Sequence, residues 1–199
     1  HDVEGSWNVM GLMGTGSKNV RVTNAFVPHY RTVGQVPLCE GEYNRNQPDA
    51  PLYHLPFGGV FSAAICSATF GIARGTLDAY RSQLPTRMSV AGVAGTRDPF
   101  QQTALAEAEA DLAAGIVHLD VMTVAMQEHV ARGNPLTLDM RLDFRRNQVR
   151  AIQRVLRSVD HLLSRAGSTA VWSTKPVERY WRDLRTAATH VCNVTDVIY

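Results

Sequence analysis

The 199-residue chain has few cysteines and no strong excess of charge of either sign. Cys39, Cys66 and Cys192 are an odd number without C-x2-C spacing, so neither a disulfide framework nor a cysteine zinc site is predicted. The formal net charge is only +2, and several arginines stand beside acids, which argues against a nucleic-acid partner. We therefore expect a reducing, cytoplasmic location.

Membrane, metal and nucleophile signals are also missing. No secretory signal is visible, and the apolar runs are too short to predict a membrane span. His118 and His129 lie eleven residues apart and His161 stands alone, so metal-ligand spacing is absent. Ser17 and Ser168 lack the context of a nucleophile elbow. These absences exclude neither a binding domain nor an enzyme that uses an organic cofactor.

Residues 1–37 carry the strand signals, and residues 1–57 are predicted to be part of a β-domain. Asn19–Thr23 alternates apolar and polar side chains with the period of a strand, and Ala25–Pro28 ends a second run at a proline. Residues 38–57 are polar and rich in turn formers, which predicts an irregular excursion.

Residues 58–199 are predicted to be helical. Asp98-Pro99 supplies an N-cap and a first-turn proline for one helix, and Gly133 follows that helix as a stop signal. The chain is therefore expected to be mostly α, with a C-terminal four-helix bundle preceded by part of a β-barrel-like middle domain. The four predicted helices span Val60–Leu84, Pro99 to just before Gly133, about Thr137 to Ala166, and the residues that follow Pro176.

Two motifs, one near each end of the chain, resemble the acyl-CoA dehydrogenase fold. The resemblance covers essentially all 199 residues and implies the C-terminal half of such an enzyme, so the chain is expected to be a fragment of a longer protein. The motifs are Trp7-x3-Gly11-Leu-Met-Gly14-Thr15-Gly16-Ser17-x2-Val20-x-Val22-x3-Phe26-Val27-Pro28 and Gly167-Ser168-x3-Trp172-x3-Pro176-x-Glu178-Arg179-x2-Arg182-Asp183.

The resemblance also bears on catalysis. His190 lies near the place where a dehydrogenase of this fold carries its glutamate base, and Val191-Cys192 stands where Glu-Gly is expected. This implies a flavin-dependent hydroxylase, similar to the hydroxyphenylacetate, hydroxy-secosteroid and pigment-pathway hydroxylases. His190 would act as an acid/base on the substrate hydroxyl. On a continuing helix Asn193 shares its face, and Asp196, farther round the axis, would orient the imidazole.

The same resemblance implies a cofactor and partners. Reduced FMN or FAD would come from a separate reductase, the substrate would be a small aromatic compound, and no metal, nucleic acid or membrane would be involved. The protein would form a homotetramer, with an arginine and a phenylalanine of one subunit reaching the flavin of its neighbour. Taken alone, Gly11–Ser17 predicts only a tight β-turn. The implied flavin contacts are Thr15, Ser17, Arg97, Phe100, Gln102, Gly167 and Ser168.

Other interpretations remain open. An acyl-CoA dehydrogenase could carry its base in the Ala73–Ala79 region, where Asp78 is the only acid. Related N- or S-oxygenases would use the same flavin chemistry as the hydroxylase, and these residues do not distinguish between them. A helical interaction domain without chemistry of its own is the third alternative.

The densest basic run of the chain lies in the third predicted helix. Its arginines mostly fall opposite the apolar stripe, which predicts a solvated face or a subunit contact. They are Arg141, Arg145, Arg146, Arg150, Arg154 and Arg157.

Overall fold

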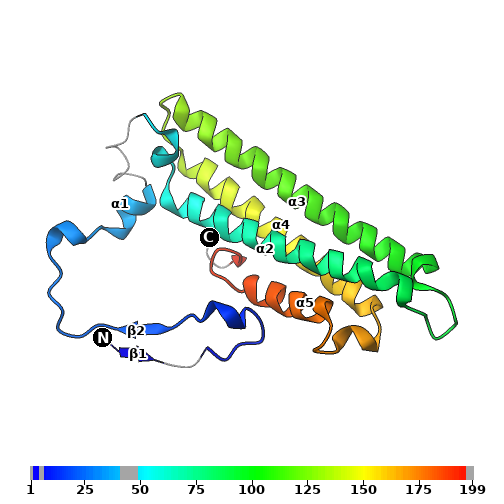
Figure 1. Ribbon diagram of the computed structural model, residues 1–199. Helices are drawn as coiled ribbons and strands as arrows, with labels where there is room; N and C mark the ends of the chain where they lie inside the picture. The colour runs from blue at the N-terminus through cyan, green and yellow to red at the C-terminus, as the bar shows by residue number, and fades with distance from the viewer. Residues whose placement is uncertain (1, 5–6, 41–48, 196–199) are drawn as a thin grey trace.

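The structure, a computed structural model, describes residues 2–4, 7–40 and 49–195. Figure 1 shows an elongated helical bundle with the N-terminal segment along one side. The predicted mostly α fold with a C-terminal four-helix bundle is confirmed. The bundle helices are α2 (Phe57–Gln83), α3 (Pro99–Ala131), α4 (Leu138–Arg165) and α5 (Pro176–Ala187).

The ends of the bundle helices follow from local chemistry. The Asp98 carboxylate accepts the backbone N–H groups of Phe100 and Gln101, which would otherwise have no partner at the start of α3. Thr137 caps α4 in the same way by accepting the N–H of Met140. Gly133 has a φ of +80° after the end of α3. These predicted boundaries are confirmed within one or two residues.

The N-terminal segment, which comprises the described residues before α2, contains little regular structure. Strand β1 (Asp2–Glu4) pairs antiparallel with β2 (Asn19–Arg21), which confirms the first strand signal. The second strand expected at Ala25–Pro28 is wrong, because this stretch has no paired strand and Pro28 has no N–H to donate. The short helices are η1 (Met13–Thr15), η2 (His29–Arg31), α1 (Gln35–Glu40) and η4 (Pro51–His54) before the bundle, and η5 (Leu84–Thr86), η6 (Gly95–Arg97) and η7 (Ser168–Val171) within it.

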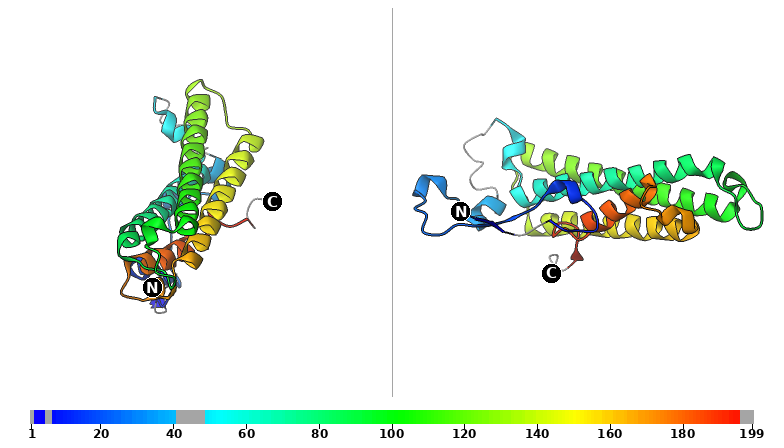
Figure 2. Two further views of the ribbon diagram at one scale, coloured as in Figure 1. Left: turned by 90° about the vertical axis from the view of Figure 1, so that its right-hand side faces the viewer. Right: turned by 60° about the horizontal axis from the view of Figure 1, so that its bottom comes forward.

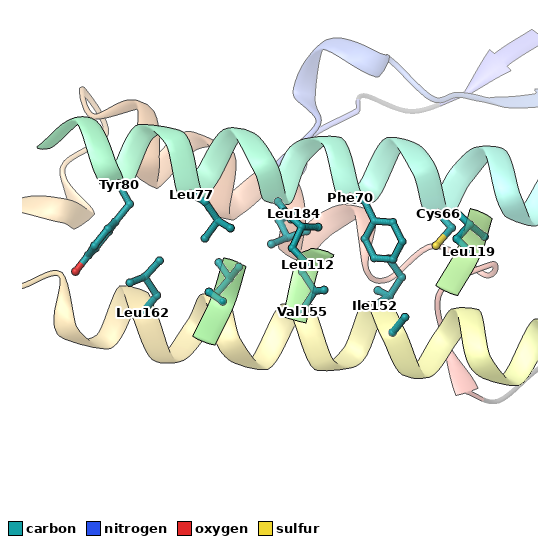
Figure 3. Packing of buried hydrophobic residues seen from close by; sticks show 14 of the residues in the cluster. Cys66, Phe70, Leu77, Tyr80, Leu112, Leu119, Ile152, Val155, Leu162 and Leu184 are labelled. Atoms are coloured by element: carbon teal, nitrogen blue, oxygen red, sulfur yellow. The ribbon is translucent and has the colours of Figure 1, made fainter. Parts of the chain in front are cut away.

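The core of the bundle lies where α2, α3 and α4 meet, with α5 against α2 (Figure 3). Leu77, Leu112 and Leu162 are completely buried there. Burying a leucine side chain stabilises a fold by about 1.5–3 kcal/mol. A Cβ atom at Gly115 would come within 2.9 Å of the Phe70 ring, so this glycine lets α3 approach α2 closely.

By length and composition alone, Phe57–Thr86 is apolar enough to cross a membrane. The expectation that no run reaches this limit is therefore wrong. The structure gives another reason for the apolar composition, because α2 packs against α3, α4 and α5 at once. A helix with three packing partners needs apolar or small side chains around most of its circumference.

Figures 1 and 2 show residues 7–21 on the α5 side of the bundle, whereas η4 packs against α3. The α5 side is where the two sequence motifs meet and where His190 lies.

Candidate functional site

His190 lies in a turn, because α5 ends at Ala187. The amide N–H of Thr189 bonds the carbonyl of Thr186, and that of His190 bonds the carbonyl of Ala187, so the chain tightens and leaves the helix. The prediction that His190 and Asn193 share a helix face is therefore wrong. Asp196 lies outside the described residues.

Asn193 holds this turn against α2. Its side chain is 2% exposed, and its amide donates to the Thr69 hydroxyl at 3.0 Å and to the Ala187 carbonyl at 2.9 Å. The second bond caps the end of α5 from beyond the helix, which explains why the helix does not continue. Asn193 thus fixes the position of the turn.

The His190 ring is oriented by its own loop. Its Nδ1 lies 3.1 Å from the backbone N–H of Cys192, which can only donate. In the neutral ring Nδ1 is therefore the acceptor, and the proton lies on Nε2. The ring is partly exposed, so Nε2 can offer a hydrogen bond outward.

An exposed aromatic pair stands beside this imidazole. The Phe61 ring centroid lies 5.9 Å from that of His190 at an interplanar angle of 57°. Phe57 stacks on Phe61 at 5.6 Å and 14°, and the two residues are 45% and 39% exposed. A hydrogen-bond donor next to an exposed aromatic surface suits an aromatic ligand that carries an oxygen.

Two polar residues of α4 hold the His190 loop from inside. The Arg145 guanidinium donates through Nη1 to the Cys192 carbonyl and through Nη2 to the Val191 carbonyl, the latter at 2.6 Å. Buried Gln148 donates to the Cys192 carbonyl at 3.1 Å and to a carbonyl of α2 at 3.0 Å. The predicted solvated face is therefore wrong for Arg145, which is part of the packed interior edge of α4.

Sequence reasoning missed Arg145 and Gln148, although a signal was present. Arg141, Arg145, Gln148 and Ile152 follow one another at spacings of four, three and four, so they lie along one face of α4. Ile152 and Gln148 are both 2% exposed. A polar row that continues an apolar stripe indicates polar contacts at the edge of the core.

A cavity of about 350 Å³ lies between the start of α2, the end of α3 and the start of α4. Most of its lining residues are apolar, and its charged ones are Arg141 and Arg145. Arg145 therefore faces this cavity and holds the His190 loop at the same time. Behind it, burial raises the pKa of the Cys66 thiol to about 12 despite the Arg145 charge, so this cysteine is not an activated nucleophile.

The two sequence motifs meet on α5. The Asp183 carboxylate accepts the backbone N–H of Leu12 at 2.6 Å, and Arg182 donates to the Met10 carbonyl at 2.6 Å. A Cβ atom at Gly11 would lie 2.2 Å from the Arg182 carbonyl oxygen, so only glycine allows this approach. The motif residues therefore dock the N-terminal segment against the helix that leads to His190.

Thr15 and Ser17 follow this docking point directly. Both are exposed, and the Thr15 hydroxyl donates to the carbonyl of Leu12. They face outward beside α5, where hydroxyl groups remain accessible to a ligand.

The other predicted flavin contacts gather at the opposite end of the bundle. Arg97 ends η6 and Phe100 opens α3, and the Arg165 guanidinium lies 5.9 Å from the Phe100 ring centroid. This contact places the start of α3 beside the end of α4, where Gly167 and Ser168 follow. Gln102 donates weakly, at 3.4 Å, to a carbonyl of η6.

The His190 end and the far end of the bundle lie well apart in one chain. Phe61, beside His190, and Gln83, at the end of α2 near η6, are separated by about 33 Å at a rise of about 1.5 Å per residue. All seven predicted flavin contacts are classed as exposed. A flavin that lies beside His190 and also uses Arg97 would therefore need residues from more than one chain.

The chemistry of the exposed groups fits a flavin nucleotide. A guanidinium fork such as that of Arg97 binds phosphate oxygens through paired charge-assisted bonds. Gly167 has a φ of +69°, a conformation that exposes backbone groups to a ligand, and Ser168 adds a hydroxyl. Thr15, Ser17 and Gln102 offer the neutral donors and acceptors that the polar edge of the flavin ring requires.

Comparisons with known proteins agree with this geometry. A pigment production hydroxylase from Rhodococcus erythropolis is 32% identical over 99% of this chain and 50% of its own length. The oxygenase subunit HsaA of a flavin-dependent monooxygenase from Rhodococcus jostii (strain RHA1) is 32% identical over 99% of this chain and 52% of its own. A crystal structure of 3-HSA hydroxylase from Rhodococcus sp. RHA1 matches with a TM-score of 0.85 and 31% identity.

That structure covers 96% of this chain, and the match covers 50% of the other protein. The chain thus spans about half the length of the curated relatives it matches. The model of the family described as "Acyl-CoA dehydrogenase, C-terminal domain" matches residues 63–194. Because this match covers more than half of the chain and agrees with the bundle and both motifs, the chain belongs to the acyl-CoA dehydrogenase family and carries its C-terminal domain.

Proposed function

We propose that the protein carrying this chain is the cytoplasmic oxygenase component of a two-component flavin-dependent monooxygenase that hydroxylates a small phenolic substrate. Its relatives include a hydroxylase and an oxygenase subunit of a flavin-dependent monooxygenase. The observation that carries the proposal is the His190 imidazole, oriented by its loop beside the exposed Phe57–Phe61 pair. A histidine and an aromatic surface suit a phenol better than an acyl thioester.

The cofactor is reduced FMN or FAD from a separate reductase. When bound, it supplies the two electrons with which one atom of dioxygen enters the substrate ring and the other leaves as water. Thr15 and Ser17 of one chain hold the flavin near α5. Arg97, Phe100, Gln102, Gly167 and Ser168 of a second chain complete the site, which makes the active protein an oligomer, a tetramer in this proposal.

His190 stabilises the substrate as its phenolate. A negative charge on the substrate oxygen activates the ring carbon beside it, so a donor that favours the anion promotes oxygen insertion. The Nε2–H group of His190 is such a donor. Exchanging a proton with the substrate, the role suggested by the sequence, would require the ring to release the Cys192 N–H bond first.

The test compares His190→Ala with His190→Gln. Loss of a charge-assisted hydrogen bond of about 1.5–3 kcal/mol lowers ring hydroxylation by about 10- to 100-fold. Reduced-flavin binding stays normal, and free hydrogen peroxide replaces the missing product. Gln retains an N–H donor, so it restores part of the yield. Rapid-mixing absorbance with product analysis measures both, and a normal rate and yield in His190→Ala would contradict the proposal.

A dehydrogenase base at Asp78 is less well supported. Asp78 pairs with Arg81 at 2.9 Å and is exposed. It lies seventeen residues along α2 from Phe61, which is about 25 Å from the His190 end. This position does not serve a substrate placed against the exposed phenylalanines.

An exposed apolar stripe also runs along α3. Val117, Val121 and Val124 are 61%, 60% and 51% exposed and lie at spacings of four and three. This stripe supports packing of copies of the chain against each other, as the tetramer requires. Sedimentation at micromolar concentration tests it, and a monomer there would contradict the shared flavin site.

A further inference from the structure

We propose that Arg145 is a positioning residue that keeps the His190 imidazole in its Nε2–H form by fixing the 191–192 peptide. The consequence for catalysis rests on the proposed function, whereas the contacts themselves do not. The chain of contacts runs from Arg145 to the Val191 and Cys192 carbonyls, and from the Cys192 N–H to Nδ1 of His190.

The first step concerns the geometry of the guanidinium. Its two terminal nitrogens donate to two consecutive carbonyls, so the 191–192 and 192–193 peptide planes are held together. An ammonium group is a single point of charge without this rigid fork. The orientation of the Cys192 N–H therefore depends on an arginine at this position.

The second step concerns charge. Within the described residues, Arg145 forms no ion pair, and burial lowers the pKa of its guanidinium. Holding a partly buried cation without a counter-ion is unfavourable unless oriented carbonyl dipoles surround it. The neutral donor Gln148 already reaches the Cys192 carbonyl, so closing the loop alone would not require a second, charged donor.

The third step connects this charge to His190. Among the described residues, the titratable groups that interact electrostatically with Arg145 are Cys66 of α2 and Cys192 of the loop. Burial keeps the Cys66 thiol neutral, so the guanidinium is the main charge on the inner side of the loop. A cation behind the loop favours an anionic oxygen opposite Nε2.

The functional test uses Arg145→Gln and Arg145→Lys in the full-length protein, with Arg146→Gln as the matched control. Arg146 is the next residue on α4, exposed and paired with Asp143 at 2.6 Å. Misplacing a reacting group by about 1 Å can cost about 10²-fold, so Arg145→Gln is expected to lower hydroxylation at least about tenfold. Flavin affinity is unchanged, Arg145→Lys recovers little, and Arg146→Gln is normal. A full product yield in Arg145→Gln would overturn the proposal.

A double variant separates positioning from a general structural effect. If Arg145 acts through His190, the variant with both Arg145→Gln and His190→Ala hydroxylates no more slowly than His190→Ala alone. If the two losses multiply, Arg145 acts independently of the imidazole and the proposal fails.

A flavin-free measurement keeps this inference distinct from the proposed function. Hydrogen–deuterium exchange of the peptide covering residues 188–193 should be at least about tenfold faster in Arg145→Gln than in Arg146→Gln. Equal exchange would overturn the positioning role. If the exchange differs but the unaltered protein never hydroxylates a phenol, the proposed function is wrong while the role of Arg145 in holding His190 is retained.

Discussion

The two ends of the helical bundle hold their polar residues in different ways. At the His190 end, buried Gln148 and Asn193 bond directly to the turn that carries the imidazole. At the far end, the Tyr80 hydroxyl bonds buried Gln101 at 3.1 Å, and Gln101 bonds Asp98 at 2.9 Å. That network supports the start of α3, while Arg97 above it is exposed.

This difference separates two tasks. The His190 end is organised within a single chain, because the groups that orient the imidazole all belong to α2, α4 and the turn itself. The far end displays charged and aromatic side chains to the outside, where a ligand or a second chain can reach them. In the proposed function, one end therefore positions the reacting group, and the other offers binding groups.

The largest expected effect comes from the docking point on α5. Gly11→Ala puts a Cβ atom 2.2 Å from the Arg182 carbonyl oxygen, so the N-terminal segment has to move away. We expect a loss of about 3 kcal/mol in the free energy of unfolding. Gly14→Ala is the control, because nothing lies within 4 Å of its added Cβ. Denaturant unfolding measures both, and equal stability of the two variants would contradict the docking role.

Asn193→Ala is expected to rank next. It removes two buried hydrogen bonds and leaves the Ala187 carbonyl and the Thr69 hydroxyl each without the partner that Asn193 supplied. The expected loss is about 2 kcal/mol of unfolding free energy, accompanied by lower hydroxylation. Gln153→Ala, on the outer side of α4, serves as the control. A fully stable Asn193→Ala variant would show that the turn is held without this amide.

At the far end, Arg97→Ala should act on binding alone. Its loss should raise the dissociation constant of the reduced flavin about tenfold, since charge-assisted hydrogen bonds contribute about 1.5–3 kcal/mol. Stability should change by less than about 0.5 kcal/mol, as for most exposed positions. Flavin titration followed by thermal unfolding separates the two quantities. Unchanged affinity would remove Arg97 from the proposed flavin site.

The smallest expected effect is the pH dependence of the stability that the Asp98 cap gives to α3. The side chain of Gln101 and the backbone N–H groups of Gln101 and Phe100 lower the pKa of Asp98. A lowered pKa in the folded state stabilises the fold above the ordinary aspartate pKa of about 4, and this contribution is lost as the pH falls through the folded value. Asp98→Asn keeps a good cap but not this titration. Its Tm should approach that of the parent protein below about pH 4.

The bundle could be predicted from sequence because its signals are local. Asp98 and Pro99 begin α3, Gly133 follows its end, and Thr137 caps α4, each through contacts within about one helical turn. The family motifs were equally readable, since their residues are close together in the chain. Their joint role was not, because Leu12 and Asp183 are far apart in sequence and meet only on α5.

The site around His190 was only partly predictable. The residue itself could be singled out from its place after the second motif. Its setting could not, because Asn193 ends α5 from beyond the helix and bonds Thr69, 124 residues away. A periodic pattern predicts a helix that continues. It does not reveal that the side-chain amide of Asn193 bonds the Ala187 carbonyl, where a further helical turn would have placed a backbone N–H.

By itself, the sequence determined the helices, their caps, the family motifs and the candidate role of His190, because each depends on neighbouring residues. Only the tertiary structure decided which nitrogen of His190 carries the proton, where the turn ends, and that Arg145 faces inward. The Cys192 N–H bond that sets the His190 tautomer is local, but the turn that presents it is held by long-range bonds, from Arg145 to the Val191 carbonyl across 46 residues and from Asn193 to Thr69 across 124. Such bonds form only after α4 and the end of α5 have packed against α2.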